Sequence, residues 1–164
     1  MNLEHGKLSE LEKYLAIYKR AREFMISTGN KDQWKESYPP RVLIINDINS
    51  GIFYVLKDNE DIVAIFALIK GIDKTYINIY EGNWFNDSTY YTIHRFASSF
   101  NKKHAFHEAI KLLTKDIKHI RIDTHADNKI MQKAIINENF KYAGIIYLEN
   151  GDPRMAYELV IGEV

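Results

Sequence analysis

The sequence predicts a mixed α/β fold, and three stretches carry this prediction. In residues 120–125, aliphatic and hydroxyl side chains alternate with charged or imidazole side chains, the period of two that is typical of a β-strand. Directly afterwards, apolar residues recur at helical spacing over residues 130–135. Residues 52–57 and 61–70 are two aliphatic and aromatic runs around a polar break, as in a β-hairpin. Strands mixed with helices in this way indicate a sheet with helices packed on it.

The N-terminal part is predicted to form a short edge strand over residues 2–5 and then a long helix. Ser9 and Glu12 have the spacing of a capping box, which predicts that a helix of about 18 residues begins at Ser9. Residues 28–30, Thr-Gly-Asn, are expected to end it. The predicted buried stripe of this helix comprises Leu11, Leu15, Tyr18 and Met25.

Three segments in the middle of the chain are less regular. Residues 41–50 contain four successive aliphatics, which fit a buried strand, but their spacing also fits a helix that follows Pro40, and periodicity does not decide between the two. Residues 76–80 are expected to form another short strand, and residues 90–98 a central one. Strict alternation in the central strand would place Tyr91, Ile93, Arg95 and Ala97 opposite Tyr90, Thr92, His94 and Phe96.

The C-terminal part is predicted to alternate between helix and strand. Residues 104–114 form a helix, with Ala105, Ala109, Ile110 and Leu113 turned inward. After the strand at 120–125, Asp127 or Asn128 caps a second helix, and Asn139 ends it. A strand follows over residues 140–147, and an Asn-Gly turn at 149–152 joins it to a final strand.

Composition limits the classes of function. The chain has 164 residues, which predicts one domain spanning residues 1–164. It has 22 basic and 22 acidic residues, so we expect neither nucleic acid nor a membrane as a partner, but a small molecule or a protein. The absence of cysteine excludes disulfides, thiolate metal sites and a cysteine nucleophile. Without a membrane-spanning run or a signal peptide, a cytoplasmic location is expected.

The strand at 120–125 ends in a group of polar side chains. Asp123, Thr124 and His125 come just before the second predicted helix, and ligands bind at such strand ends in open α/β sheets. The alternative is a polar loop in which Asp and Thr only cap the helix. His104 and His107, with Glu108, are spaced for a metal, but no third ligand is placed, so exposed polar residues are favoured and no metal is predicted.

Three stretches of the sequence carry a resemblance to a known family. They are AREFMISTGNKDQW in residues 21–34, YYTIHRFAS in 90–98 and IRIDTHADNKIMQ in 120–132. The chain resembles, over nearly its whole length, a bacterial branch of the GNAT superfamily of acyl-CoA-dependent N-acyltransferases. The resemblance implies the GNAT fold, in which helices flank a mixed, mostly antiparallel central sheet whose two neighbouring parallel strands splay apart. It also implies that residues 41–50 are helical.

The resemblance implies that acetyl-CoA is a co-substrate bound in the gap between the splayed strands. Backbone groups of the first splayed strand would pair with the pantetheine, since unpaired amides need partners. The following loop and helix start would hold the pyrophosphate. The implied cofactor-binding residues are Phe96, Ala97, Ser98, Asn101, Lys102, Lys103, His104, Ala105, Phe106 and Asn128.

The sequence departs from the family at two points. His104 and Phe106 stand where the family loop has small residues that let phosphate approach the backbone. Ile135 stands seven residues after Asn128, where many relatives have a tyrosine that protonates the departing thiolate. Two functions therefore remain: an active N-acetyltransferase, and a degenerate relative that serves as a binding or assembly module without this activity.

The implied reaction is direct attack of a primary amine, from a small molecule or a peptide, on the thioester carbonyl. Such a reaction needs a base and a donor for the oxyanion. The candidate catalytic residues are Asp123, His125 and His94; alternatively, Asp123 pairs with Arg95 or Arg121, and His94 bonds a backbone carbonyl. Candidates for the acceptor pocket are Trp34, Glu81, Trp84 and Tyr91. The resemblance also allows a homodimer, which no residue pattern fixes.

Overall fold

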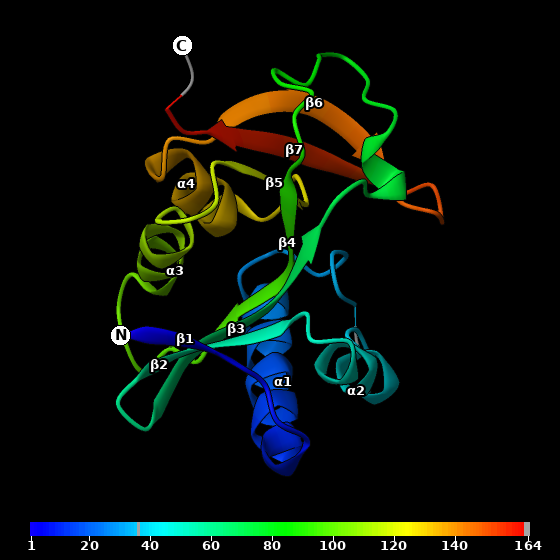
Figure 1. The fold of residues 1–164 in the computed structure, drawn as a ribbon. Coiled ribbons are helices and arrows are strands. Elements are labelled where there is room, and N and C mark those ends of the chain that lie inside the picture. The colour runs from blue at the N-terminus through cyan, green and yellow to red at the C-terminus, as the bar shows by residue number, and fades with distance from the viewer. Residues whose placement is uncertain (36, 163–164) are drawn as a thin grey trace.

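A computed structural model describes residues 1–35 and 37–162, and in this part of the chain a seven-stranded sheet is packed with four α-helices (Figure 1). The strands are β1 (Asn2–His5), β2 (Phe53–Asp58), β3 (Asp61–Lys70), β4 (Tyr91–Ser98), β5 (His119–Thr124), β6 (Lys141–Tyr147) and β7 (Pro153–Val160). The helices are α1 (Leu11–Ser27), α2 (Arg41–Asn49), α3 (Ala105–Leu113) and α4 (Lys129–Asn137), with short 3-10 helices η1 (Leu8–Glu10) and η2 (Lys74–Tyr76). The strand order is β1-β2-β3-β4-β5-β7-β6.

The parallel pair β4 and β5 divides the sheet into two parts. All other neighbouring strands are antiparallel. The pairing of β4 with β5 covers Tyr91 to Ile93 on one strand and Ile120 to Ile122 on the other, and ends there. Beyond these residues the two strands diverge, which confirms the splayed parallel strands expected for this chain.

A bulge in β4 overturns the predicted alternation of its side chains. Arg95 has a left-handed backbone (φ 55°), and the register with β3 shifts at this point. Consequently Ile93 and Phe96 pack on one face of the sheet, while Ala97 packs on the other. Such a backbone costs a non-glycine residue about 1 kcal/mol or more. The hydroxyl of Tyr18 stabilises it, because it donates to the Arg95 carbonyl at 2.9 Å.

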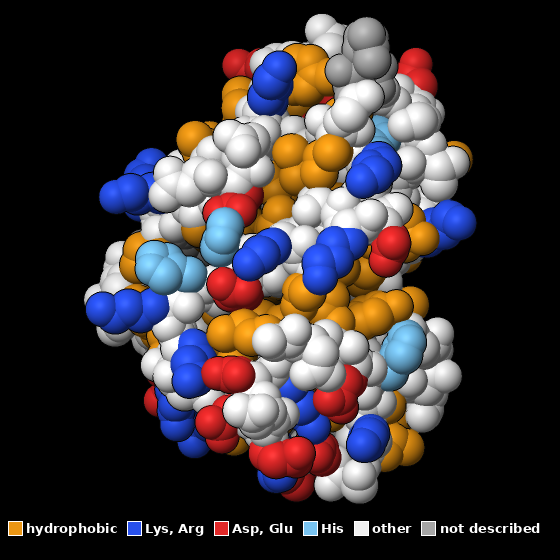
Figure 2. Space-filling view, turned by 60° about the vertical axis from the view of Figure 1, so that its left-hand side comes forward, with side chains coloured by type: hydrophobic (Ala, Val, Ile, Leu, Met, Phe, Trp, Pro, Cys, Tyr) orange, Lys and Arg blue, Asp and Glu red, His pale blue; other side chains and the backbone are white. Residues whose placement is uncertain are grey.

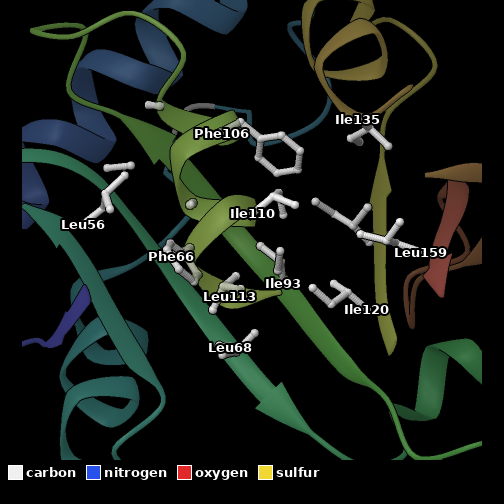
Figure 3. Close-up of a cluster of buried hydrophobic side chains, with 14 of the residues drawn as sticks. Leu56, Phe66, Leu68, Ile93, Phe106, Ile110, Leu113, Ile120, Ile135 and Leu159 are labelled. Atoms are coloured by element: carbon white, nitrogen blue, oxygen red, sulfur yellow. The ribbon is translucent and has the colours of Figure 1, made fainter. Parts of the chain in front are cut away.

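Two hydrophobic clusters bind the helices to opposite faces of the sheet. One lies between the sheet and helices α3 and α4, and is drawn in Figure 3 with Phe106, Ile110 and Leu113 of α3 facing β-strand residues such as Phe66 and Ile120. The other lies beneath α1 and α2 and contains Tyr14, Tyr18, Trp34, Ile44 and Phe53. The sheet is therefore covered by helices on both faces.

The predicted start of the first helix is wrong by two residues. Ser9 lies in η1, and α1 begins at Leu11 without a side-chain cap. The hydroxyl of Tyr14 accepts a hydrogen bond from Lys7 N at 3.1 Å, which ties the residue before η1 to the first turn of α1. The fully buried stripe is Leu11, Tyr14, Tyr18 and Ala21, whereas the predicted Leu15 and Met25 are only partly buried.

Residues 76–80 do not form the predicted strand. Asp73 caps η2 instead, because its carboxylate accepts from Thr75 N at 2.9 Å and from the Thr75 hydroxyl at 2.7 Å. Only Tyr80 makes an isolated bridge, to Ile145 of β6. The connection from β3 to β4 thus packs over β6 and β7 through Tyr76.

The local signals in the second half are confirmed. Asn128, not Asp127, caps α4 by accepting from Met131 N at 3.0 Å, and Asn139 follows the helix with φ 69°. Gly151 in the final turn has φ 88°, a conformation that glycine adopts without strain. Residues 41–49 are helical, as the family resemblance implied. None of the helices in the described part of the chain is long and apolar enough to cross a bilayer.

Candidate active site

A cavity of about 710 Å³ opens where β4 and β5 diverge. One wall comes from the end of α1 and residues 33–34, a second from the end of β4 and the start of α3, and a third from the end of β5 and α4. Figure 2, which brings the α3 and α4 side forward, shows hydrophobic side chains gathered on this face with Lys, Arg and His side chains around them. A cavity of this size with apolar walls suits a cofactor-sized ligand.

Every residue that the resemblance implied for cofactor binding lines this cavity. The set comprises Phe96, Ala97, Ser98, Asn101, Lys102, Lys103, His104, Ala105, Phe106 and Asn128, and it is joined by Trp34 and Asp123. The structure therefore brings together residues from three separate stretches of sequence. Their roles remain predictions.

The loop without glycines leaves the cavity open. His104 has a left-handed backbone (φ 62°), the conformation for which a glycine is usual, and its side chain is exposed. Phe106 is turned into the core, where its ring meets that of Phe96 at 5.1 Å between centroids, and it is only 7% exposed. Lys102 forms an ion pair with Asp58 at 3.0 Å. Among the two lysines of the loop, Lys103 thus has no ion pair within the described residues.

Asp123 is a partly buried carboxylate that lines the cavity. Its Oδ2 accepts a hydrogen bond from the Tyr76 hydroxyl at 2.6 Å. Burial raises the pKa of Asp123 and outweighs the nearby charge of His94 and the Tyr76 hydrogen bond, which both lower it. A carboxyl with a raised pKa can accept a proton more readily near neutral pH, as a general base requires.

Neither predicted arginine partner pairs with Asp123. Arg95 is engaged by Asp47 through two hydrogen bonds of 3.0 and 3.1 Å. Arg121 donates to Glu158 at 2.9 Å. The alternative in which Asp123 is merely a salt-bridge partner of one of these arginines is therefore wrong.

His94 lies behind Tyr76 and does not line the cavity. Its Nε2 is 2.7 Å from Asp73 Oδ2, so the predicted bond to a backbone carbonyl is wrong. Burial alone would raise the pKa of Asp73, but hydrogen bonds from His94 and Thr75, together with the charge of His94, lower it to about 2. The rings of His94 and Tyr76 are 6.3 Å apart between centroids. The Tyr76 side chain therefore lies between the His94–Asp73 pair and Asp123.

His125 closes the turn after β5 and lies outside the cavity lining. Its Nδ1 accepts a hydrogen bond from Asp127 N at 2.9 Å. This bond fixes the ring, so that in the neutral form the proton is on Nε2.

Three of the predicted acceptor residues are not at the cavity. Trp84 Nε1 donates to the Tyr76 carbonyl at 2.8 Å, Glu81 is exposed, and Tyr91 packs towards α3. The reason is that the connection between β3 and β4 packs on β6 and β7 instead of folding over the gap. Only Trp34 of this predicted group lines the cavity, where it is 6% exposed.

Sequence reasoning missed Gln33, which joins two walls of the cavity. Its Oε1 accepts from Asn30 Nδ2 at 2.8 Å, from Asn128 Nδ2 at 3.0 Å and from the Thr124 hydroxyl at 3.5 Å. Its carbonyl accepts from Arg154 of β7 at 3.2 Å. The only signal was its place in the stretch 21–34, which carries the family resemblance. Tyr76 and Asp73 were also missed, although the Asp-x-Thr spacing at 73–75 is a local capping signal.

No group of three or more metal-ligating side chains is found among residues 1–35 and 37–162. The histidine that follows the loop, His107, is paired with Glu138 of α4 at 2.9 Å.

Comparison with known proteins yields full-length structural matches. No protein-family model matches the chain, and no curated protein sequence does. Among solved structures, a GNAT-family acetyltransferase from Streptococcus agalactiae shares 28% identity, with a TM-score of 0.89 over 99% of this chain and 96% of that chain. An aminoglycoside N(6')acetyltransferase from Legionella pneumophila shares 15% identity and has a TM-score of 0.65, over 98% of this chain and 91% of the other. A ribosomal-protein-alanine N-acetyltransferase from Brucella melitensis shares 12% identity, with a TM-score of 0.59 over 98% of this chain and 100% of the other. The last two matches show the fold alone.

Proposed function

Because the chain belongs to the GNAT superfamily of acetyltransferases, we propose that it transfers the acetyl group of acetyl-CoA to a primary amine of a small molecule or peptide. One observation carries the proposal. The cavity at the divergence of β4 and β5 is lined both by the loop and helix start at residues 101–107 and by a partly buried carboxylate, Asp123. These are the two features that a long, anionic thioester and a nucleophilic amine require.

The lining residues fit acetyl-CoA. Beyond Ile93, β4 has lost β5 as a partner. The Arg95 carbonyl accepts from Tyr18, so the backbone groups left to pair with the amides of pantetheine are those of Phe96 to Ser98 that face away from β3. Amides at the start of α3, with Lys103 beside them, would hold the pyrophosphate. The apolar side chains of Ile130, Met131 and Ala134 would cover the hydrocarbon parts of the cofactor.

Asp123 would act as the general base. The amine nitrogen attacks the thioester carbon, a C–N bond forms, and the carbonyl electron pair moves to oxygen. Asp123 takes one proton from the nitrogen. When the carbonyl re-forms, the C–S bond breaks and the thiolate leaves with its electron pair. The thiolate takes a proton from solvent and Asp123 releases its proton to solvent, so that the products are an N-acetyl amide and CoA and the carboxylate is restored. A thiolate is a sufficiently stable anion to leave without a tyrosine at position 135, where this chain has Ile135.

Titration calorimetry with acetyl-CoA tests the proposal. Ala134→Trp, which fills the cavity, should weaken binding at least about tenfold, whereas Ala16→Trp on the exposed side of α1 should leave it unchanged. Thermal unfolding of both variants checks that they are folded. If the unaltered protein gives no heat at millimolar acetyl-CoA, the transferase proposal fails and the binding or assembly module is left. If heat is seen, acetylation of a panel of amines identifies the acceptor.

A further inference from the structure

Gln33 presents an amide group to the cavity in one fixed orientation. Its Oε1 accepts hydrogen bonds from Asn30, Thr124 and Asn128. The orientation of Asn128 is itself fixed, since its Oδ1 caps α4 by accepting from Met131 N. Asn128 can therefore only donate to Gln33 through its NH₂ group, so the Gln33 atom that accepts must be its amide oxygen. The Nε2 of Gln33 is consequently turned away from these three donors.

The Gln33 amide nitrogen has two donor hydrogens without an acceptor. Among the described residues, no hydrogen bond from Nε2 is found, while Gln33 lines the cavity. The backbone at this position is also held, because Arg154, which is 5% exposed, donates to the Gln33 carbonyl. A donor that is held in place before the ligand arrives has little reorganisation to undergo during reaction, which is the property of an oxyanion hole.

The position of Gln33 matches the place where the thioester would lie. Its partner Thr124 is two residues past Ile122, the last residue of β5 that pairs with β4. Side chains alternate along a strand, so Asp123 and Thr124 point to opposite faces of β5. Asp123, Thr124 and Gln33 all line the cavity, so a ligand that occupies the gap beyond the paired part of β5 can reach both the carboxylate and the Gln33 amide.

We propose that Gln33 is a catalytic residue whose Nε2 donates a hydrogen bond to the thioester carbonyl oxygen of acetyl-CoA. The inference rests on the proposed function, and it assigns the donor that the reaction needs besides its base. As the amine attacks, the carbonyl electron pair moves onto oxygen and this hydrogen bond strengthens. It weakens again when the C–S bond breaks. Removal of one such donor typically lowers kcat on the order of 100-fold.

The infrared carbonyl band of bound, carbonyl-¹³C-labelled acetyl-CoA tests the inference directly. A hydrogen bond to the oxygen lowers the frequency of this band, so the band should shift down on binding to the unaltered protein. In Gln33→Met and in Gln33→Glu, which keeps the shape and the acceptor oxygens but has no N–H to donate, the band should return towards its frequency in free acetyl-CoA. Both variants should lower kcat on the order of 100-fold while the Kd for acetyl-CoA changes less than about threefold.

Two matched variants separate this role from a structural one and from a neighbouring donor. Gln132 is the other glutamine of the chain, and its Nε2 donates to the carbonyls of His125 and Ala126 outside the cavity. Gln132→Met should keep the shifted band. Trp34 also lines the cavity and carries an indole N–H that could compete as the donor. It is replaced by Phe to remove this N–H, and the band should again stay shifted.

The outcomes distinguish the inference from the proposed function. If acetyl-CoA binds but its band is not shifted, or is unchanged in both Gln33 variants, the assignment of Gln33 is overturned and the transferase proposal stands. If the shift is lost in Trp34→Phe alone, the donor to the thioester carbonyl is Trp34, and the assignment of Gln33 is likewise overturned. If the unaltered protein does not bind acetyl-CoA, both proposals are overturned together.

Discussion

The two ends of β5 carry similar polar residues in opposite situations. At its beginning, His119 and Arg121 meet Glu158 of β7, and all three side chains are buried. The Arg121 guanidinium also lies 4.0 Å from the ring centres of Trp84 and Tyr90. Burial alone would raise the pKa of Glu158, but hydrogen bonds from His119, Phe85 N and Arg121 outweigh it, and the pKa is lowered. This end is sealed, and its charges are balanced.

At the end of the same strand, Asp123 faces a cavity. Its only hydrogen-bond donor among the described side chains is the Tyr76 hydroxyl, and its burial prevails, so its pKa is raised. The difference is in the partners, not in the residue type. A carboxylate with a full set of donors stabilises the fold and is inert, whereas one that is buried with too few donors is available to take a proton from a ligand.

The largest effect is expected from breaking the sealed end. In Glu158→Ala, Arg121 and His119 lose their buried partner, and an uncompensated buried charge costs about 3–5 kcal/mol in free energy of unfolding. Urea unfolding monitored by circular dichroism measures this difference. The exposed Glu149→Ala should change it by less than about 0.5 kcal/mol. A Glu158→Ala protein as stable as its parent would mean that the two ends of β5 do not differ in the way described.

Asp123→Asn should show the difference between the two ends of β5 most clearly, because it should lower kcat. Asn keeps the size and can accept from Tyr76, but it is not a base, so kcat should fall at least about 100-fold. Acetyl-CoA affinity should change less than about twofold, because the base serves the amine and not the cofactor.

Stability gives the matching control for Asp123→Asn. A carboxyl whose pKa is raised on folding contributes stability at low pH and loses it as the pH rises through the folded pKa. At pH 7 the variant should therefore be at least as stable as the parent, which denaturant unfolding would check. An unchanged kcat would remove Asp123 from the mechanism.

The features of β5 and its surroundings that could be predicted from sequence are those set by neighbouring residues. Asn128 as a cap and Asn139 as a helix end were predictable, because each acts on backbone groups within a few residues. The capping box at Ser9 failed because Ser9 lies within the 3-10 helix η1, so α1 begins only at Leu11.

Features set by remote contacts could not be read from periodicity. Nothing in the residues around Arg95 signals a left-handed backbone. It is fixed by Tyr18 of α1, and Asp47 of α2 holds the side chain. The divergence of β4 from β5 was likewise implied by family resemblance and not by pattern, since both strands alternate regularly in sequence. The positions of Glu81 and Trp84 depend on how a long connection packs, which no local signal determines.

A smaller effect is expected from Asp73, which lies behind the open end. Its pKa is about 2 in the folded protein and 3.8 as a free side chain, so its ionised form stabilises the fold by about 2 kcal/mol above pH 4. This contribution is lost as the pH falls from about 4 to 2. Asp73→Asn, which can still cap η2, should lower the free energy of unfolding by this amount at pH 7 and by less than about 0.5 kcal/mol at pH 2. Unfolding in urea across this pH range measures the difference. Asp116→Asn, at an exposed position, should show no such dependence.

The smallest effect is expected at His104, which lines the same cavity as Asp123 just before α3. Its φ of 62° suits glycine, so His104→Gly should raise the free energy of unfolding by up to about 1 kcal/mol. If His104 is only a substitute for the family's glycine, the variant should also bind acetyl-CoA a few times more tightly, because phosphate can then approach the backbone. His107→Gly, within α3, should instead lose about 1 kcal/mol. Weaker acetyl-CoA binding by His104→Gly in calorimetry would instead make the imidazole a ligand of the phosphates. The cavity would then contain two polar groups that act on the ligand, the imidazole of His104 and the carboxylate of Asp123.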